Sequence, residues 1–387
     1  FIAIGLCHLS PRRAQQEIET LLSGQWADGR LPQIIFQTGH DDAYSPGRPF
    51  WRSERLPGAP VVPTAGLIQP PNHAWAALLV HHADPKESAR RSFLERAYPK
   101  LSAWHGYLSR RRNRGGSGLA ALVHPWETGM DNSPPWDEVL ARIELHGHDA
   151  VPRPDLLHAD ASERPTNSEY GRYLYLAGRY RDHGCDDQDP DFPFLVEDPG
   201  TNALWIASEH ALAEIARLVG EDPRPHTESA TRLTEALGGL FDDERGIFLA
   251  RDVTTGRLLD KATVSGLLPL LVEDLPQRER LLATLFGPMF DLEGTVMVPS
   301  YDLTAPDADL ARYWRGPAWF NTTWLLVRAL RSCGHEDAAA RLSRHMRGLA
   351  LAHDFPEYVH PMTGAPHGTR AFSWTAALAL DLSLTEM

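Results

Sequence analysis

The sequence predicts an all-α protein whose helices form a toroid of helical hairpins, with at most one short β-hairpin. Apolar residues recur at helical spacing through most of the chain after residue 72, and strand-like alternation is scarce. The helices follow one another in pairs, with functional-looking loops on alternate connections. The periodicity alone establishes the helices, and the closed ring is inferred from their pairing. In such a ring, loops far apart in sequence converge on one pocket.

The expected elements follow the apolar spacing along the chain. Residues 1–24 contain two short helices separated by Ser10-Pro11, and a region rich in proline and glycine follows up to residue 71. Loops of this length in a compact protein are often functional. The best strand signal is residues 246–252, with a turn at Thr255-Gly256. The other expected helices are 72–83, 86–113, 136–146, 168–181, 201–219, 226–240, 264–273, 277–286, 318–333, 336–352 and 371–384.

Composition and charge narrow the class of protein. Of the 387 residues, 42% are hydrophobic and 23% are charged, which is typical of a globular protein with a large core. The net charge of −13 argues against nucleic acid or an anionic membrane surface as the main partner. No apolar run reaches the roughly 18 residues that a membrane span needs. We therefore expect a small-molecule partner, and the oligomeric state stays open.

The cysteines and the first residues bear on the compartment. Cys7, Cys185 and Cys333 are odd in number and far apart, so a disulfide framework is not expected and a reducing, cytoplasmic location is favoured. The chain begins at Phe1, without a methionine, in what reads as the interior of a helix. We therefore expect the natural N-terminus to lie upstream of Phe1. Residues 1–387 are expected to form a single domain.

Neither a metal nor another cofactor is expected. The acidic run 182–191 lacks the EF-hand spacing, and no His-Glu-x-x-His motif occurs among the 18 histidines. The basic run 110–114 ends an expected helix, where cations complement the helix dipole. Both charged runs are therefore interpreted as solvated surface.

A first candidate site lies at residues 124–137, which contain three acids and two tryptophans. Ser133, followed by two prolines, is a helix-start signal, so Asp131 is expected on the loop that enters a helix. The helix dipole favours the ionised form of Asp131, whereas desolvation by Trp126 and Trp136 favours the neutral form. The sequence alone does not decide between these effects.

Two further candidate segments lie in the second half of the chain. Glu357 is followed by Tyr358 and, after two glycines, by Trp374. Arg315 lies in an aromatic segment that begins at Tyr313, where it can bind a hydroxyl or hold a carboxylate in position. Trp324, in the helix after this segment, is interpreted as a core residue.

Paired acids on aromatic-rich loops are typical of glycoside hydrolysis. One carboxylic acid protonates the leaving oxygen, and one carboxylate activates water or attacks directly. Indole faces pack against the C–H faces of sugar rings, and carboxylates bind hydroxyls. The alternative interpretation, that these loops are helix caps with packing residues, stays open from composition alone.

The motifs resemble those of glycoside hydrolase family 63, in its bacterial branch of mannosylglycerate and glucosylglycerate hydrolases (MGH1-like). The resemblance is carried, in order, by residues 126–133, 313–319 and 357–375, and it includes segments 25–36 and 69–71. It implies an (α/α)6 barrel and an inverting α-glycosidase. Family members usually carry a Trp-Asp pair just before the position of Phe1, which this sequence does not contain.

The resemblance also implies roles for individual residues. Asp131 matches the general acid and Glu357 the general base, which then stand about 6.5–9.5 Å apart. Asp131 must then be neutral in the resting enzyme, and Glu127 is expected to support Arg315 or a sugar hydroxyl. The residues expected to bind substrate are Gln33, Gln69, Trp126, Glu127, Tyr313, Trp314, Arg315, Trp319, Tyr358 and Trp374.

Several functions remain open at this point. The leading one is hydrolysis of a small α-glucoside or α-mannoside, with glucosylglycerate or mannosylglycerate as candidates. Cationic or multi-donor partners for the glycerate carboxylate are available on one long loop, at His40, Tyr44, Arg48 and Arg52. The alternatives are a glucosidase for neutral saccharides, a saccharide-binding protein without activity, and a lyase acting on uronates.

Overall fold

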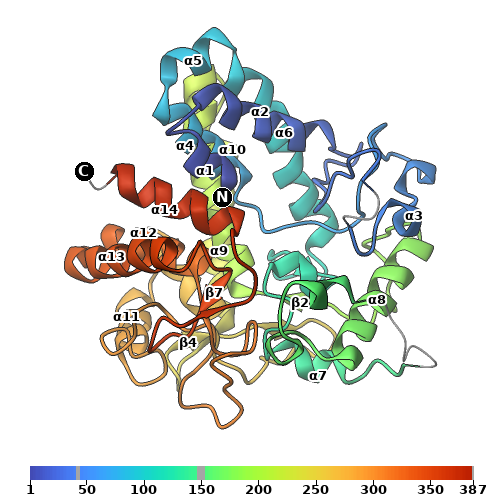
Figure 1. Cartoon of the computed structure of the whole chain (residues 1–387). Coiled ribbons are helices and arrows are strands. Elements are labelled where there is room, and N and C mark those ends of the chain that lie inside the picture. The colour runs from blue at the N-terminus through green and yellow to red at the C-terminus, as the bar shows by residue number, and fades with distance from the viewer. Residues whose placement is uncertain (41–43, 146–152, 386–387) are drawn as a thin grey trace.

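A computed structural model describes residues 1–40, 44–145 and 153–385, and these are mostly helical (Figure 1). The α-helices are α1 (Ile2–Leu6), α2 (Pro11–Ser23), α3 (Arg48–Trp51), α4 (His73–Ala83), α5 (Pro85–Arg90), α6 (Phe93–Tyr107), α7 (Trp136–Leu140), α8 (Asn167–Asp182), α9 (Pro199–Val219), α10 (Arg224–Leu237), α11 (Arg278–Phe286), α12 (Phe320–Ser332), α13 (Glu336–Ala352) and α14 (Ser373–Thr385). The strands are β1 (Ala121–Leu122), β2 (Val196–Glu197), β3 (Phe241–Asp242), β4 (Ile247–Phe248), β5 (Arg251–Asp252), β6 (Ala318–Trp319), β7 (Tyr358–Val359) and β8 (Pro366–His367).

The first and last helices pack against each other and close the ring of helices (Figure 1). A Cβ atom on Gly5 of α1 would lie 2.2 Å from the carbonyl oxygen of Ala377 in α14, so only glycine permits this approach. His8 Nε2 lies 2.8 Å from a carboxylate oxygen of Asp381 in α14. Phe1 contacts the Trp374 ring edge-on at a centroid distance of 6.2 Å. The ring is thus closed by contacts between the two ends of the chain.

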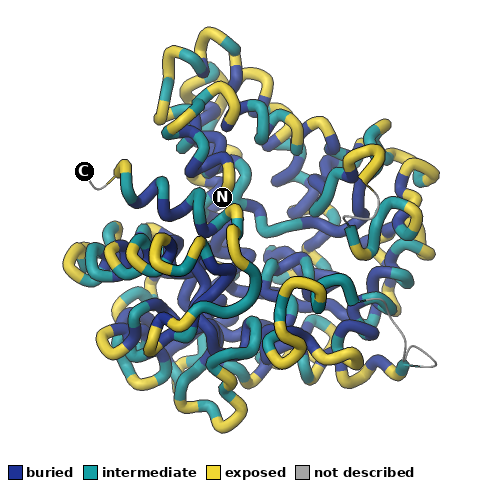
Figure 2. The backbone as a smooth tube through the Cα atoms, in the orientation of Figure 1, coloured by how far each residue is buried: buried dark blue, intermediate teal, exposed yellow. Residues whose placement is uncertain are grey.

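Helix α9 runs through the middle of the molecule and forms much of the core. It packs against α4, α6, α10 and a 3₁₀ helix over Val264–Leu271. Most of its residues are buried, whereas the outer helices α11 and α13 expose one side (Figure 2). Trp324 in α12 is fully buried and its indole donates to Asp381, so the prediction of a core residue is confirmed.

The expected helices differ from the observed ones at three places. The helix expected over 86–113 is interrupted at Ser92, whose backbone is left-handed with φ 47°, and a π-helical turn follows α6. The helix expected over 136–146 ends at Leu140, and residue 146 lies outside the described residues. The stretch expected over 264–273 is a 3₁₀ helix that contains a proline.

The strands form three small sheets, which is more β-structure than the single hairpin expected. The expected hairpin forms around Thr255-Gly256 as an antiparallel bridge between Arg251 and Leu258. Its first strand is split, because β4 pairs with β3 and β5 pairs with β2. In the third sheet, β7 pairs with both β6 and β8, and Trp319 lies opposite Tyr358. This pairing joins the loop before α12 to the loop before α14. It therefore brings two of the three aromatic candidate segments together.

The two charged runs are only partly solvated surface: Arg110, Asp182, Asp186 and Asp191 are exposed, but the runs also meet in the interior. Arg112 has no exposed area, and its Nε lies 3.0 Å from Asp187. Arg30 Nη2 reaches the same carboxylate at 3.2 Å, and the hydroxyls of Tyr107 and Tyr180 donate to it at 2.7 and 2.6 Å. Burial alone would raise the pKa of Asp187, but the two guanidinium groups hold it below its usual value.

Two further expectations concern the cysteines and the membrane. Cys7, Cys185 and Cys333 form no disulfide. Among the residues that the structure describes, every helix is too short or too polar to cross a lipid bilayer.

Candidate active site

A cavity of about 320 Å³ lies where the aromatic loops converge. Its size is in the range that holds a small ligand. Nine of the twelve expected site residues line it: Gln33, Gln69, Trp126, Asp131, Tyr313, Trp314, Trp319, Glu357 and Trp374. The remaining three, Glu127, Arg315 and Tyr358, lie behind its walls. The sequence segments that carry the resemblance thus enclose one space.

Asp131 lies on a tightly bonded loop between the 3₁₀ helix Pro125–Thr128 and α7. Gly129 ends the 3₁₀ helix with a left-handed φ of 69°, which favours glycine. The carbonyl of Met130 accepts from the Trp136 indole at 2.9 Å, and the Asp131 carbonyl accepts from the Tyr173 hydroxyl at 2.8 Å. These bonds fix the backbone on both sides of the Asp131 side chain.

The expected Ser133 cap is not formed. Helix α7 begins at Trp136, and its N-cap position is Pro135, without a side-chain cap. The Ser133 carbonyl accepts from the Trp136 N–H at 3.2 Å instead. The prediction that Asp131 lies on the loop entering a helix is correct, but the helix starts two residues later than a Ser133 cap implies.

Burial decides the protonation of Asp131. It raises the pKa of this carboxyl from 3.8 to about 6, and the negative charge of Glu357 acts in the same direction. The nearby Arg164 opposes the shift without reversing it. Desolvation therefore outweighs the effects that favour ionisation, and Asp131 is a carboxyl group that can carry a proton under mildly acidic conditions.

Glu357 precedes β7 and is held on both carboxylate oxygens. Arg164 Nη1 donates to Oε1 at 3.1 Å and Nη2 to Oε2 at 2.5 Å, while the Thr369 N–H donates to Oε2 at 3.1 Å. A Cβ atom on Gly368 would lie 2.5 Å from Oε2, so a side chain there would push the carboxylate away from Arg164. Oε1 accepts only one of these bonds and so retains a lone pair.

Stacked aromatic rings form one wall of the cavity. The rings of Trp314 and Trp319 stack at a centroid distance of 4.0 Å and an angle of 3°, and Trp374 contacts Trp319 edge-on. Tyr358 stacks on Trp319 at 4.5 Å and is fully buried, so it supports the wall without lining the cavity. Tyr313 holds a left-handed backbone with φ 43°, a costly conformation that is typical of functional sites.

Arg315 is bound to protein groups outside the cavity lining. Its Nη1 donates to Asp137 at 2.9 Å, its Nη2 to Glu169 at 3.2 Å, and its Nε to Asn132 at 3.3 Å. It therefore ties α7 and α8 together directly beside Asp131. In this arrangement Arg315 positions the loop that carries Asp131. Its guanidinium group donates to Asn132, Asp137 and Glu169.

Glu127 supports a different arginine from the one expected. It is fully buried, and both of its oxygens accept from Arg112, at 2.6 and 2.7 Å. The backbone N–H groups of Ile68 and Val123 donate to the same carboxylate at 3.1 and 2.9 Å. The expectation that Glu127 supports Arg315 is wrong, because Arg112 from the basic run occupies it.

Replacing Glu127 with glutamine should destabilise the fold. The change leaves Arg112 beside an uncharged group and turns an amide N–H₂ toward existing donors, so we expect a loss of about 3–5 kcal/mol. This corresponds to a fall in Tm of about 4–6 °C for a chain of this length. Thermal unfolding measures it, with the exposed Glu138→Gln as the control. Equal Tm values for the two variants would contradict the network.

Several residues that line the cavity or support its carboxylates were not anticipated from the sequence. Arg164 carries no local motif, yet it anchors Glu357. Ser45, Pro46 and Trp51 come from the long irregular region, and Phe372 precedes α14. The only available signal was the proline- and glycine-rich composition of that region, which indicates a functional loop without specifying its residues.

The cationic loop residues expected to bind a carboxylate lie off the cavity. Within the described ranges, His40, Tyr44, Arg48 and Arg52 are not among its lining residues. Arg48 lies 3.5 Å from Glu54 in an ion pair. The same loop does reach the cavity, through Ser45 and Pro46.

A second cavity of about 510 Å³ adjoins the first and is lined mostly by apolar groups. The side chains of Gln33, Gln69, Phe372 and Trp374 line both cavities. The two glutamines are therefore the polar side chains at the junction. Together the two cavities offer space for a ligand with two parts.

A helical ring with a tryptophan-walled, carboxyl-bearing cavity is typical of the α/α-toroid glycosidases. Neutral trehalase from Saccharomyces cerevisiae has a similar fold, with a TM-score of 0.54 at 17% identity over 83% of this chain and 64% of that chain. The sequence matches the family described as "mannosylglycerate hydrolase MGH1-like glycoside hydrolase domain" over residues 1–375. The chain belongs to this family of glycoside hydrolases.

The relatives cover nearly the whole chain. It is 40% identical over 394 residues to mannosylglycerate hydrolase from Rubrobacter radiotolerans, covering 99% of this chain and 89% of that protein. It is 37% identical over 408 residues to glucosylglycerate hydrolase from Mycolicibacterium hassiacum, covering 98% and 89%. The crystal structure of GH63 mannosylglycerate hydrolase from Thermus thermophilus in complex with Tris and D-glycerate has a TM-score of 0.91 at 35% identity, covering 99% and 91%.

Proposed function

We propose that this enzyme hydrolyses an α-mannoside or α-glucoside of glycerate with inversion at the anomeric carbon. In this proposal Asp131 is the general acid and Glu357 is the general base. One observation carries it: the two carboxyl groups line the same cavity in contrasting environments. Asp131 is desolvated with a raised pKa, whereas Glu357 is paired with an arginine. Such a contrast is what assigns the acid and the base.

In the proposed reaction Asp131 donates one proton and Glu357 accepts one. Asp131 donates its proton to the glycosidic oxygen as the bond to the anomeric carbon breaks. Glu357 accepts a proton from the water that attacks the opposite face of the sugar. Its Oε1 is the suitable atom, because it accepts one hydrogen bond whereas Oε2 is the more heavily bonded oxygen. The sugar ring packs against aromatic residues that line the cavity, among them Trp126, Trp314 and Trp374.

The glycerate part of the proposal rests on the relatives and on the polar groups at the junction of the two cavities. The named relatives act on mannosylglycerate or glucosylglycerate. Gln33 and Gln69 offer amide N–H donors at the junction, and Ser45 adds a hydroxyl. Amide and hydroxyl donors are suited to a carboxylate that must be held without a full ion pair.

Matched glycosides test the substrate. Mannosylglycerate and mannosylglycerol differ only in a carboxylate, as do glucosylglycerate and glucosylglycerol. We expect kcat/KM to be at least about 100-fold higher for the glycerate member of each pair, because it alone makes charge-assisted hydrogen bonds. Equal rates on the glycerol members or on neutral α-disaccharides would overturn the glycerate assignment and favour a glucosidase for neutral saccharides.

Activity should fall with rising pH. Asp131 must be protonated to act as the acid, and its pKa lies at about 6. Above that pH, kcat/KM should fall about tenfold per pH unit, since the protonated fraction falls by that factor. A pH profile on the preferred substrate measures this limb. If kcat/KM stays constant up to pH 8, a group other than Asp131 must be the acid.

Arg164 should act by orienting Glu357. Lysine keeps the charge but replaces the two-point guanidinium contact with a single donor, so Arg164→Lys should lower kcat by about 10- to 100-fold with little change in KM. Arg172→Lys is the control, because Arg172 contacts Ser168 and the Ile143 carbonyl on the outer side of α8. Steady-state kinetics of both variants decide the point: an unchanged kcat in Arg164→Lys would refute the orienting role.

A further inference from the structure

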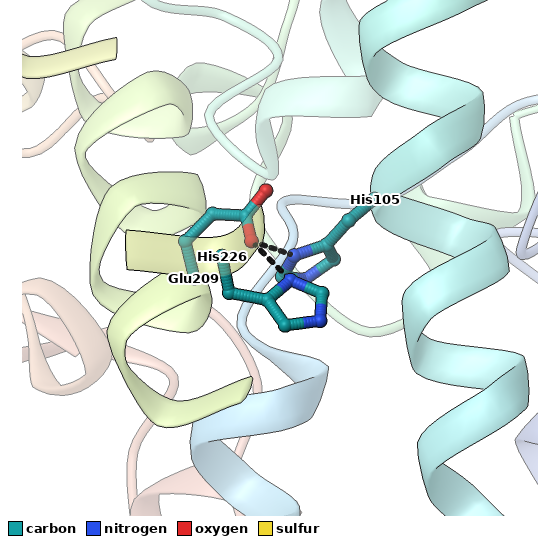
Figure 3. A group of neighbouring side chains, drawn as sticks. All are labelled: His105, Glu209 and His226. Atoms are coloured by element: carbon teal, nitrogen blue, oxygen red, sulfur yellow. Dashed lines mark hydrogen bonds and ion pairs between the residues drawn. The ribbon is translucent and has the colours of Figure 1, made fainter. Parts of the chain in front are cut away.

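Three side chains outside the catalytic cavity converge in the interior between α6, α9 and α10. They are His105, Glu209 and His226, one from each helix (Figure 3). Their exposed fractions are 3%, 2% and 7%. The Nδ1 atoms of His105 and His226 lie 3.1 and 3.0 Å from the same oxygen, Oε2 of Glu209 (Figure 3).

Hydrogen bonding among the three residues does not account for His105. The Nδ1 of His226 forms a hydrogen bond with Glu209, whereas the Nδ1 of His105 contacts Glu209 at ion-pair distance without a hydrogen bond. Within the described part of the chain, neither ring nitrogen of His105 has a hydrogen-bond partner, although both are buried. A buried polar atom without a hydrogen bond costs about 1–3 kcal/mol, and an ion bound at the Nδ1 of His105 would give that atom a partner.

The spacing of the three residues suits a metal ion. One ligand atom from each residue lies within 4.8 Å of the others. In a tetrahedral zinc site with bonds of about 2.0–2.2 Å, neighbouring ligand atoms are about 3.3–3.5 Å apart. The observed nitrogen-to-oxygen distances of 3.0 and 3.1 Å therefore need to lengthen by only a few tenths of an ångström.

Further side chains form hydrogen bonds with the outward-facing atoms of Glu209 and His226. The other oxygen of Glu209 accepts from the Trp205 indole at 3.1 Å and from the Ser229 hydroxyl at 2.9 Å. The other ring nitrogen of His226 lies 3.3 Å from the Tyr98 hydroxyl. Such partners orient metal ligands and set the histidine tautomer. They leave Oε2 of Glu209 and Nδ1 of His226 available to an ion, which would take the place of the contact between these two atoms.

We propose that His105, Glu209 and His226 bind a divalent ion of the zinc class, with solvent at the fourth position. Two imidazoles and one carboxylate are a ligand set that such ions accept. The ion would join α6 to the consecutive helices α9 and α10. Thr201, in the first turn of α9, lines the larger cavity, about 12 Å along the helix from Glu209. The site therefore acts in stability, separately from the proposed hydrolytic chemistry.

Metal binding by the full chain tests the proposal. The protein is stripped with a chelator and titrated with Zn²⁺ or Co²⁺ alone, and bound metal is counted after gel filtration. We expect about one ion per chain, the visible absorption of tetrahedral Co²⁺, and a rise in Tm that a chelator reverses. The absence of retained metal, or an unchanged Tm, would overturn the site.

Variants separate this site from surface histidines. Glu209→Gln and His226→Gln should weaken Zn²⁺ binding by more than about 100-fold, because losing a ligand costs more than losing an outer-shell partner. His210→Gln, at the exposed neighbouring position of α9, is the matched control and should bind like the wild type. Tyr98→Phe, which removes only a hydroxyl, should weaken binding by about 10- to 100-fold even if the buried variants fold poorly. Equal affinity in Glu209→Gln, Tyr98→Phe and the control would refute the assignment.

Discussion

Replacing Asp131 with asparagine is expected to lower kcat by about 10³-fold, within the 10²- to 10⁴-fold that a positioned acid contributes. Asparagine keeps the size of the side chain but has no proton to donate to the leaving oxygen. KM should change little, because the aromatic wall and the glutamines that line the cavity are unaltered. Steady-state kinetics on the preferred glycoside measure the effect.

The stability of this variant distinguishes lost chemistry from lost folding. The pKa of Asp131 is about 6 in the folded protein and near 3.8 when the chain unfolds. The unfolded chain therefore loses this proton first, and folding stability falls as the pH rises from about 4 to about 6. Asparagine cannot ionise, so the Tm of Asp131→Asn at pH 7 should equal or exceed that of the wild type. A large fall in Tm together with kcat would contradict this account.

Replacing Glu357 with glutamine should cause a similar loss of kcat for a different reason. The amide cannot accept a proton from the attacking water, so we expect a loss of about 10²- to 10⁴-fold. Unlike Asp131→Asn, this variant should also unfold more easily. Arg164 is 6% exposed and would lose its charged partner, which costs about 3–5 kcal/mol when such a pair is buried.

A double variant separates the two effects of Glu357→Gln. When Arg164→Gln is added, no unpaired buried charge remains, so much of the lost stability should return. Activity should stay low, because no base is restored. Thermal unfolding and kinetics of the single and double variants measure this. Recovery of activity in the double variant would show that Glu357 is not the base.

The long helices were predictable because their apolar periodicity agrees with the tertiary packing. Helices α9, α12 and α13 lie within two residues of their expected bounds. The break at Ser92 was missed because neither glycine nor proline marks it. The two-residue strands β6 and β7 were missed because alternation cannot be seen over so few positions. They nevertheless bring the segment with Trp319 to the segment with Glu357.

The candidate site was predictable where its residues carry local chemical signals. Asp131 and Glu357 stand in aromatic-rich segments, and both line the cavity, although their roles stay predictions. Arg164 has no such signal, since its partner is 193 residues away. The same limit explains the misread charged runs: Arg112 and Asp187 each look solvated, and only the fold reveals their pairing.

The opposite effects of the helix dipole and of the indoles on the pKa of Asp131 could not be compared from the sequence. The burial of Asp131 depends on the whole cavity. The histidine and glutamate cluster between α6, α9 and α10 was invisible for a related reason. Its three residues come from separate helices and match no local metal-binding spacing. Long-range geometry therefore supplies most of what the sequence could not.

The anomeric form of the first product is the most direct test of the central claim, that Asp131 and Glu357 act as acid and base across a space that admits water. Proton NMR of freshly released sugar, recorded before mutarotation, reads this form. The account predicts that an α-glycoside of glycerate releases the β-anomer first. Release of the α-anomer first would contradict it, because retention requires a carboxylate that attacks the sugar directly.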